Sequence, residues 1–98
     1  MLAWFNTKAA KELGVSLAST YINCVPPAEK LSEKKLVAFS RQALGKMGRE
    51  LDNFKKNNEL NIYKTAKMGN AFKWALKDAG YSDNQIDKLT EWLMAAAR

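Results

Sequence analysis

The segment that decides the fold is SEKKLVAFSRQALGKMGRELDNFKK, residues 32–56. Its apolar side chains recur every three or four residues, which is the spacing of one face of an α-helix. At 1.5 Å per residue, a helix of this length measures roughly 36 Å. A compact domain of this size is roughly 33 Å across, so the helix must span the domain or protrude from it. The predicted inner face contains Val37, Ser40, Leu44, Met47, Leu51 and Phe54.

Composition predicts one globular domain over residues 1–98, because 47% of the residues are hydrophobic and 10% are aromatic. The net charge of +6 permits nucleic acid, anionic lipid or an acidic protein as a partner. The excess lies in the middle of the chain. Residues 31–58 carry seven lysines and arginines against three acidic residues.

The chain lacks the usual groups for catalysis and metal binding. It has no histidine, which removes the commonest general base and metal ligand. Its single cysteine, Cys24, excludes an internal disulfide and a thiolate zinc cluster. A lone cysteine is typical of a reducing compartment, and no apolar run is long enough to span a membrane. We therefore expect a cytoplasmic protein that is not an enzyme and that has no cofactor and no bound metal.

Start and stop signals divide the chain into four helices. Pro26 and Pro27 end the first helix, since residues before proline leave the α region. Ser32 caps the second helix, Gly80 ends the third, and Ser82 starts the fourth. The predicted fold is all-α, a four-helix bundle-like domain with one long central helix and a tight helical hairpin at residues 80–82. The predicted helices cover residues 7–24, 32–56, 59–79 and 82–97.

Glycines interrupt three of these helices and suggest where helices approach one another. Gly14 lies within the inner face of the first helix, where another helix close by would justify it. Gly45 and Gly48 lie in the middle of the second helix and predict a close crossing or a bend. The third helix has a predicted inner face made of Ile62, Ala66, Gly69, Phe72, Leu76 and Ala79.

Two short stretches have glycines at the turn spacing of DNA-binding motifs. Residues 10–16, AKELGVS, resemble the first half of a helix-turn-helix motif, and residues 76–89 have Gly80, Tyr81 and Ser82 at a similar turn. In the first stretch the apolar face continues through Gly14, which favours an unbroken helix. In the second, the would-be recognition helix is net acidic, whereas phosphate contacts need cations. We therefore favour a plain helical hairpin.

The third helix has a second stripe, rotated away from its inner face, in which aromatic residues alternate with lysines. Such a stripe is suited to gripping a partner protein or stacking on bases. The alternative is that its aromatic rings pack against a neighbouring helix or the first five residues. If the stripe is exposed, it is the first choice for a binding surface. Its members are Tyr63, Lys67, Asn70, Trp74 and Lys77.

The expected role is a helical module that binds a partner protein or itself, with a homodimer as one form. A candidate oligomer contact runs along the long helix and contains Leu36, Gly45, Gly48 and Phe54. Nucleic-acid binding through the basic middle helices is the alternative function. Trp4 and Phe5 could anchor a membrane surface, but folding back onto a core is the preferred reading of that pair.

Overall fold

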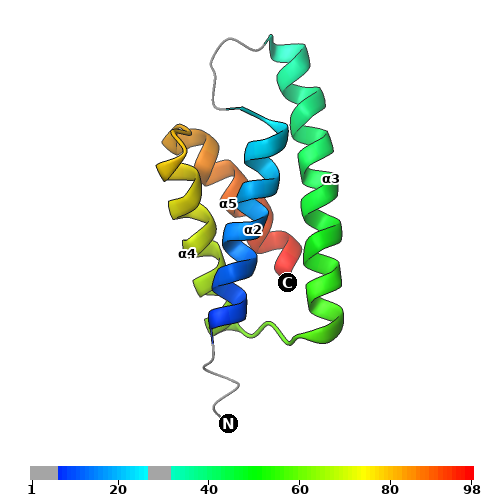
Figure 1. Ribbon diagram of the computed structural model, residues 1–98, viewed down its shortest axis with the longest axis vertical. Helices are drawn as coiled ribbons and strands as arrows, with labels where there is room; N and C mark the ends of the chain where they lie inside the picture. The colour runs from blue at the N-terminus through cyan, green and yellow to red at the C-terminus, as the bar shows by residue number, and fades with distance from the viewer. Residues whose placement is uncertain (1–6, 27–31) are drawn as a thin grey trace.

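The computed structural model describes residues 7–26 and 32–98, which form an all-α bundle of four helices without strands in the described part (Figure 1). Trp4, Phe5 and Leu31 lie outside the described residues, so the predictions made for them stay predictions. The fold class predicted from the sequence is confirmed. The helices are α2 (Lys8–Cys24), α3 (Glu33–Asn57), α4 (Ile62–Asp78) and α5 (Asp83–Ala97).

Side-chain caps fix where three of the helices begin. Ser32 and Ser82 each accept a hydrogen bond from the backbone N–H three residues later, at 3.2 Å in both cases. Asn61 does the same for α4, because its Oδ1 accepts from the Lys64 N–H at 2.8 Å. Each bond satisfies one of the backbone donors that a helix leaves open in its first turn. The Asn61 cap explains why α4 starts at Ile62, three residues later than predicted.

The hairpin between α4 and α5 has the geometry that its sequence predicts. Gly80 has a φ of 95°, a left-handed conformation that only glycine adopts without strain. The Gly80 N–H donates to the Lys77 carbonyl at 3.1 Å, and the Tyr81 N–H donates to the Leu76 carbonyl at 3.2 Å. These two bonds define a Schellman motif. It reverses the chain within three residues and positions α5 against α4.

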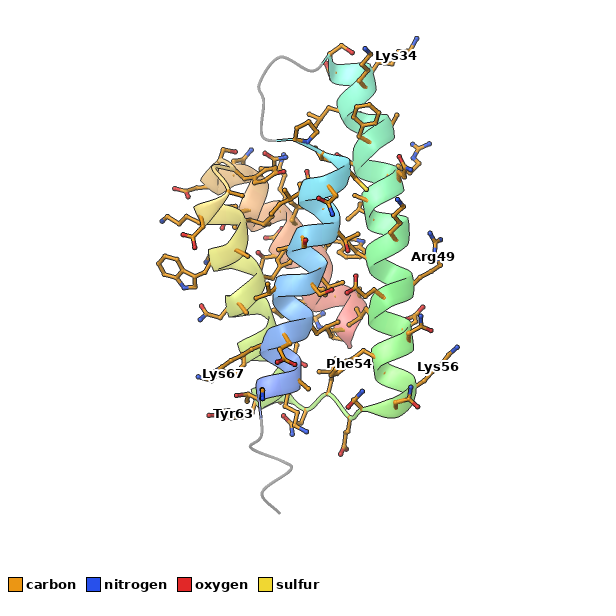
Figure 2. All side chains as sticks on the ribbon, viewed as in Figure 1. Lys34, Arg49, Phe54, Lys56, Tyr63 and Lys67 are labelled. Carbon is orange, nitrogen blue, oxygen red and sulfur yellow. The ribbon has the colours of Figure 1, made fainter. Side chains whose placement is uncertain are left out.

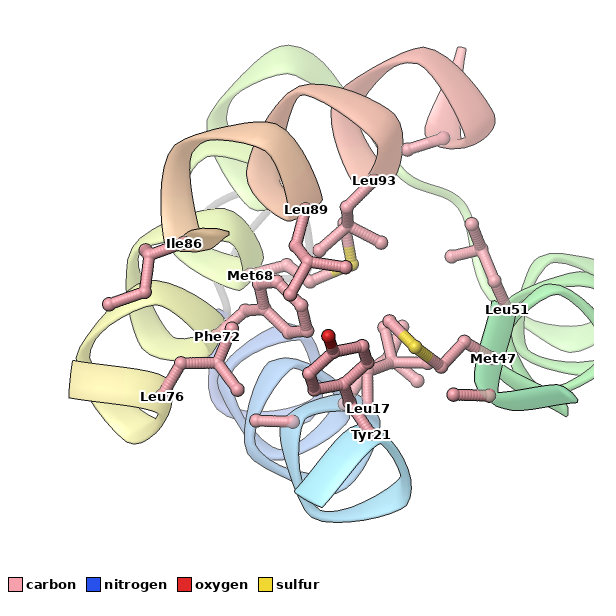
Figure 3. Packing of buried hydrophobic residues seen from close by; sticks show 14 of the residues in the cluster. Leu17, Tyr21, Met47, Leu51, Met68, Phe72, Leu76, Ile86, Leu89 and Leu93 are labelled. Carbon is pink, nitrogen blue, oxygen red and sulfur yellow. The ribbon is translucent and has the colours of Figure 1, made fainter. Parts of the chain in front are cut away.

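The described helices enclose one hydrophobic core, to which all four contribute (Figure 3). Figure 1 shows α2 between α4 and α3, with α5 crossing behind it. The long helix α3 therefore lies at one side of the bundle, and α2 has a neighbour on each side. The largest fully buried side chains are Tyr21, Phe72, Leu17, Met47, Leu51, Met68, Leu76 and Ile86.

The contact between α2 and α4 is a backbone contact at Gly14. A Cβ at this position would lie 2.3 Å from the Met68 carbonyl oxygen and 3.1 Å from the Ala71 Cβ. Only glycine leaves room for that approach, since no real Cβ sits so close to a backbone atom. The predicted close approach at Gly14 is therefore confirmed, and its partner is α4.

The long helix α3 joins the bundle mainly through its lower half, the residues from 43 to 57, and Phe39 is the large apolar side chain above them that packs against the core. Its buried residues are Ala43, Met47 and Leu51, and none of residues 32–42 is buried. Glu50 adds a polar tie to α2, because its carboxylate accepts from the hydroxyls of Ser16 and Thr20, the latter at 3.0 Å. The upper half of α3, residues 33–42, extends beyond this contact.

Two parts of the predicted inner faces are wrong. Val37 is 51% exposed, because α3 reaches past its neighbours at that end. Ile62 is 88% exposed and Ala66 is also exposed, because the Asn61 cap makes Ile62 the first residue of α4, before its inner face meets α2. The predicted crossing at Gly45 and Gly48 is discussed below.

Candidate binding surfaces

The α4 stripe of Tyr63, Lys67, Asn70, Trp74 and Lys77 lies along one side of α4, opposite the buried Phe72 and Leu76. Trp74 is 56% exposed, and Tyr63 is exposed as well. Neither ring is buried against a neighbouring helix, whereas packing against the first five residues lies outside the described residues and stays a prediction. Figure 2 shows Tyr63 and Lys67 projecting at the edge of the molecule, at the lower end of α4.

Each aromatic ring of the α4 stripe has a lysine from the next turn of the helix beside it. The Lys67 ammonium lies 5.6 Å from the centre of the Tyr63 ring, and the Lys77 ammonium lies 5.6 Å from the Trp74 ring. Both distances are within the range of a cation–π interaction. Each exposed ring of the stripe therefore has a positive charge beside it.

A second surface is a groove between the upper half of α3 and the N-terminal half of α5, with Tyr21 of α2 at its floor. We call it the α3–α5 groove. Two adjoining hollows form it, of about 360 and 560 Å³, and they share Leu36, Ser40 and Lys88. On the α3 side, the groove is lined by Leu36, Val37, Ser40, Arg41 and Leu44. On the α5 side, it is lined by Asn84, Gln85, Lys88 and Leu89.

The α3–α5 groove is closed at its lower end and open at its upper end. At the lower end, the Lys55 ammonium donates to the Arg98 carbonyl at 3.4 Å, and Met47 and Leu51 of α3 pack into the core near Leu93 (Figure 3). At the upper end, Leu36 and Val37 are exposed. Between these two ends, side chains of α3 and α5 line the space that separates the helices.

The floor of the groove is a fixed polar cluster. The Gln85 side-chain amide donates to the Tyr21 hydroxyl at 2.7 Å, and the Tyr81 hydroxyl donates to the Val25 carbonyl. The rings of Tyr21 and Tyr81 meet edge to face, with centres 5.5 Å apart. Burial and, to a smaller extent, the nearby Tyr21 together raise the pKa of Tyr81 from 10.0 to about 12. Tyr81 is therefore a neutral hydrogen-bond donor at physiological pH.

The predicted oligomer contact does not form one continuous surface. Leu36 is exposed at the upper end of α3, but Phe54 at the lower end is half-buried against the core. A Cβ at Gly48 would meet no atom within 4 Å, and one at Gly45 would meet only the side chain of Arg49, on the same helix. No helix in the described part of the chain therefore crosses closely at Gly45 and Gly48, and the predicted bend and a contact with a second copy stay predictions. Of the residues in the predicted oligomer contact, Leu36 is the one that lines the α3–α5 groove.

Other predicted features are placed as follows. Residues 10–16 lie within the continuous helix α2, so the turn of a helix-turn-helix motif is absent there. The basic residues of α3 are spread along the outer side of the helix, as Figure 2 shows for Lys34, Arg49 and Lys56. Among the described residues, no group of acidic or cysteine side chains is arranged to hold a metal. Within the same part of the chain, no helix has both the length and the apolar character needed to cross a bilayer.

Comparisons with known proteins identify no relative. No known protein family, curated protein or solved structure matches this chain. The function is therefore argued from the surfaces alone.

The sequence did not predict the α5 side of the groove. In the sequence, the first two turns of α5 contain ordinary polar residues, among them Asn84, Gln85 and Lys88. The spacing within α5 does not show that these residues face α3. The available signal was on α3, where Leu36 and Val37 are apolar at positions that a short neighbouring helix cannot cover.

Proposed function

We propose that this protein is a non-enzymatic helical module that binds an acidic protein through the α4 stripe. The exposure of Trp74 carries this proposal. Tryptophan is rare on protein surfaces and is strongly enriched among the residues that dominate binding energy. Here it is 56% exposed on a helix whose opposite face is fully packed.

The charge around Trp74 supports a partner other than a second copy. Lys67 and Lys77 are the charged members of the α4 stripe, and both are positive. In a two-fold dimer the same patch faces itself, so these lysines would meet lysines. An acidic partner that offers a pocket for the indole ring would instead gain from both features.

The experiment places a photo-crosslinking amino acid at position 74 and, as a control, at position 15, where Val15 of α2 is also exposed. The protein is irradiated in the cells that produce it, and the adducts are identified by mass spectrometry. The partner is then purified, and its affinity is measured for the wild type, Trp74→Ala and Val15→Ala. We expect an adduct specific to position 74 and a loss of affinity of about 30-fold or more for Trp74→Ala alone. Equal affinity of Trp74→Ala and the wild type would refute the proposal.

A second candidate function is binding of single-stranded nucleic acid by the same stripe. The observation in its favour is the pairing of each exposed ring with a lysine, since bases stack on aromatic rings and phosphates bind ammonium groups. The test is fluorescence anisotropy of a labelled single-stranded oligonucleotide at low ionic strength. Affinity that falls steeply with salt and is lost in Trp74→Ala would favour this function over protein binding. If no binding is seen at low salt, this alternative is excluded.

Self-association is tested separately by sedimentation equilibrium over a wide range of protein concentration. The proposal of an acidic partner predicts a monomer throughout that range. A dimer that Trp74→Ala dissociates would instead make the α4 stripe a self-association surface.

A further inference from the structure

The upper half of α3 has apolar side chains that no described residue covers. Leu36 and Val37 are exposed, whereas Phe39 is half-buried and packs against the core. The first buried residue of the helix is Ala43, eleven residues after the Ser32 cap. A solvated helix has no need for two adjacent large apolar residues, because polar side chains with high helix propensity would serve there. The composition of this half is that of a helix face with a partner.

The shape of the α3–α5 groove fits one more helix. From Leu36 to Leu44 the groove follows α3 for roughly 12 Å, which is about two helical turns. Its α3 wall is mainly apolar, with Leu36, Val37 and Leu44, and its α5 wall offers Leu89 beside polar side chains. An amphipathic helix binds such a groove with apolar residues spaced three and four apart.

The charge of the rim specifies the partner. Among the described residues, the charged side chains that line the groove are Arg41 on α3 and Lys88 on α5, and none is a carboxylate. Both cations therefore flank any helix that lies in the groove. A two-fold copy would bring Arg41 and Lys88 against their own equivalents, and this like-charge contact disfavours a second copy of the chain.

We propose that the α3–α5 groove binds an amphipathic helix of another protein, with apolar residues against Leu36, Val37, Leu44 and Leu89 and carboxylates beside Arg41 and Lys88. This site lies on the opposite side of α2 from the α4 stripe (Figure 1), and it is independent of the function proposed for that stripe. The molecule would then hold two partners, or two parts of one partner, at the same time.

The experiment uses the full chain and a synthetic probe helix. The probe has leucines at positions one, four, five and eight, continued at the same spacing, and glutamates on both sides of this apolar face. A second peptide, with lysine in place of each glutamate, is the charge control. Binding is followed by the backbone amide shifts of the ¹⁵N-labelled protein. We expect the acidic peptide to shift amides in residues 36–44 and 84–89 and to leave residues 70–77 unchanged. We expect weaker binding of the basic peptide by about tenfold or more.

Charge reversal provides the decisive variants, because Arg41, Lys88 and Arg49 are all exposed and their replacement leaves the core unchanged. Arg41→Glu and Lys88→Glu should each lower the affinity for the acidic peptide by about tenfold and raise the affinity for the basic peptide. Arg49→Glu makes the same charge change on the outer side of α3 and should alter either affinity by less than about threefold. Trp74→Ala should bind both peptides as the wild type does, so failure of the α4 proposal leaves this test intact.

Three outcomes would overturn the proposal. The first is no binding of the acidic peptide at millimolar concentration, and the second is a set of shifts outside the groove. The third is an equal change in peptide affinity for the Arg49→Glu and Lys88→Glu variants, which would show that binding depends on the net charge of the protein alone. A concentration-dependent dimer that Leu36→Asp dissociates would assign the groove to a second copy of the chain and would also refute an acidic partner.

Discussion

The helix α2 has two neighbours that it contacts in different ways. Against α4, it brings its backbone at Gly14 to the Met68 carbonyl, with no room for a methyl group. Against α3, it uses larger side chains and the hydrogen bonds from Ser16 and Thr20 to Glu50. The first contact fixes a short distance between two backbones. The second contact is made mainly by one half of α3 and leaves Leu36 and Val37 in the other half exposed.

This difference separates glycines that look alike in the sequence. Gly14 lies within the apolar stripe of one predicted helix and Gly48 lies beside the apolar stripe of another, and each weakens its helix in isolation. Gly14 is required by a neighbouring backbone, whereas Gly48 has open space around the position of a Cβ. A glycine in a helical stripe therefore indicates a close contact only when a second helix lies against it.

The largest expected effect is on stability, and it should differ between the two halves of α3. Met47→Ala removes a fully buried side chain from the lower half and should lower the free energy of unfolding by about 3 kcal/mol. Val37→Ala truncates an exposed side chain in the upper half and should change it by less than about 0.5 kcal/mol. Urea unfolding monitored by circular dichroism measures both. Equal losses would show that the upper half is packed in solution.

The next effect tests the backbone contact between α2 and α4. Gly14→Ala places a methyl group against the Met68 carbonyl, and such overpacking costs about 3 kcal/mol. Alanine has a helix propensity more favourable than that of glycine by about 1 kcal/mol, so we expect the free energy of unfolding to fall by about 2 kcal/mol in total. The control is Gly69→Ala, whose added Cβ meets only the end of the flexible Met94 side chain. A Gly14→Ala variant as stable as the wild type would contradict the close contact.

The sequence predicted the four helices, their order and the hairpin because each has local signals. Ser32, Ser82 and Gly80 act on backbone groups within four residues of themselves, so their effect is readable without knowledge of the fold. The Asn61 cap is of the same kind and was missed, which placed Ile62 wrongly on the inner face. Pattern alone shows a helical face, but the exact first turn depends on which polar residue forms the cap.

The sequence predicted the members of the α4 stripe but left their exposure open, because exposure depends on what the other helices cover. For the same reason it did not predict the α3–α5 groove. The groove depends on the angle at which α5 crosses behind α2, and that angle is set by the packing of Leu89 and Leu93 with residues far away in the chain. A single sequence contains the spacing within α5 but not its register against α3.

A smaller effect tests the upper end of α2, where it meets the start of α5. Tyr81→Phe removes the hydrogen bond to the Val25 carbonyl and leaves that buried oxygen without its donor, which should cost about 1.5 kcal/mol. The measurement is again urea unfolding at neutral pH. Ser19→Ala is the control, because it removes a hydroxyl from an exposed side chain of α2 and should not lower the stability. Equal losses in the two variants would contradict a structural role for the Tyr81 hydroxyl.

The same hydroxyl makes stability fall in alkaline solution. The pKa of Tyr81 is raised from 10.0 to about 12 in the folded state, so the unfolded chain releases this proton first as the pH rises. The stabilisation is complete below pH 10 and is lost progressively between pH 10 and about 12. The wild type should therefore lose more stability over this interval than Tyr81→Phe does. Parallel losses in the two proteins would show that other groups account for the whole alkaline effect.

The smallest effect has the opposite sign and completes the comparison of the glycines. Gly48→Ala adds a methyl group where no atom lies within 4 Å, so the only change is in the helix backbone. Alanine is favoured over glycine in a helix interior by about 0.5 to 1 kcal/mol, and the variant should gain that much stability. Differential scanning calorimetry should show a rise in Tm. The contrary outcome is a loss of stability that appears only at concentrations where the wild type self-associates. It would place a helix of a second chain against Gly48, because the added methyl group would obstruct contact between molecules but leave the single chain unaffected.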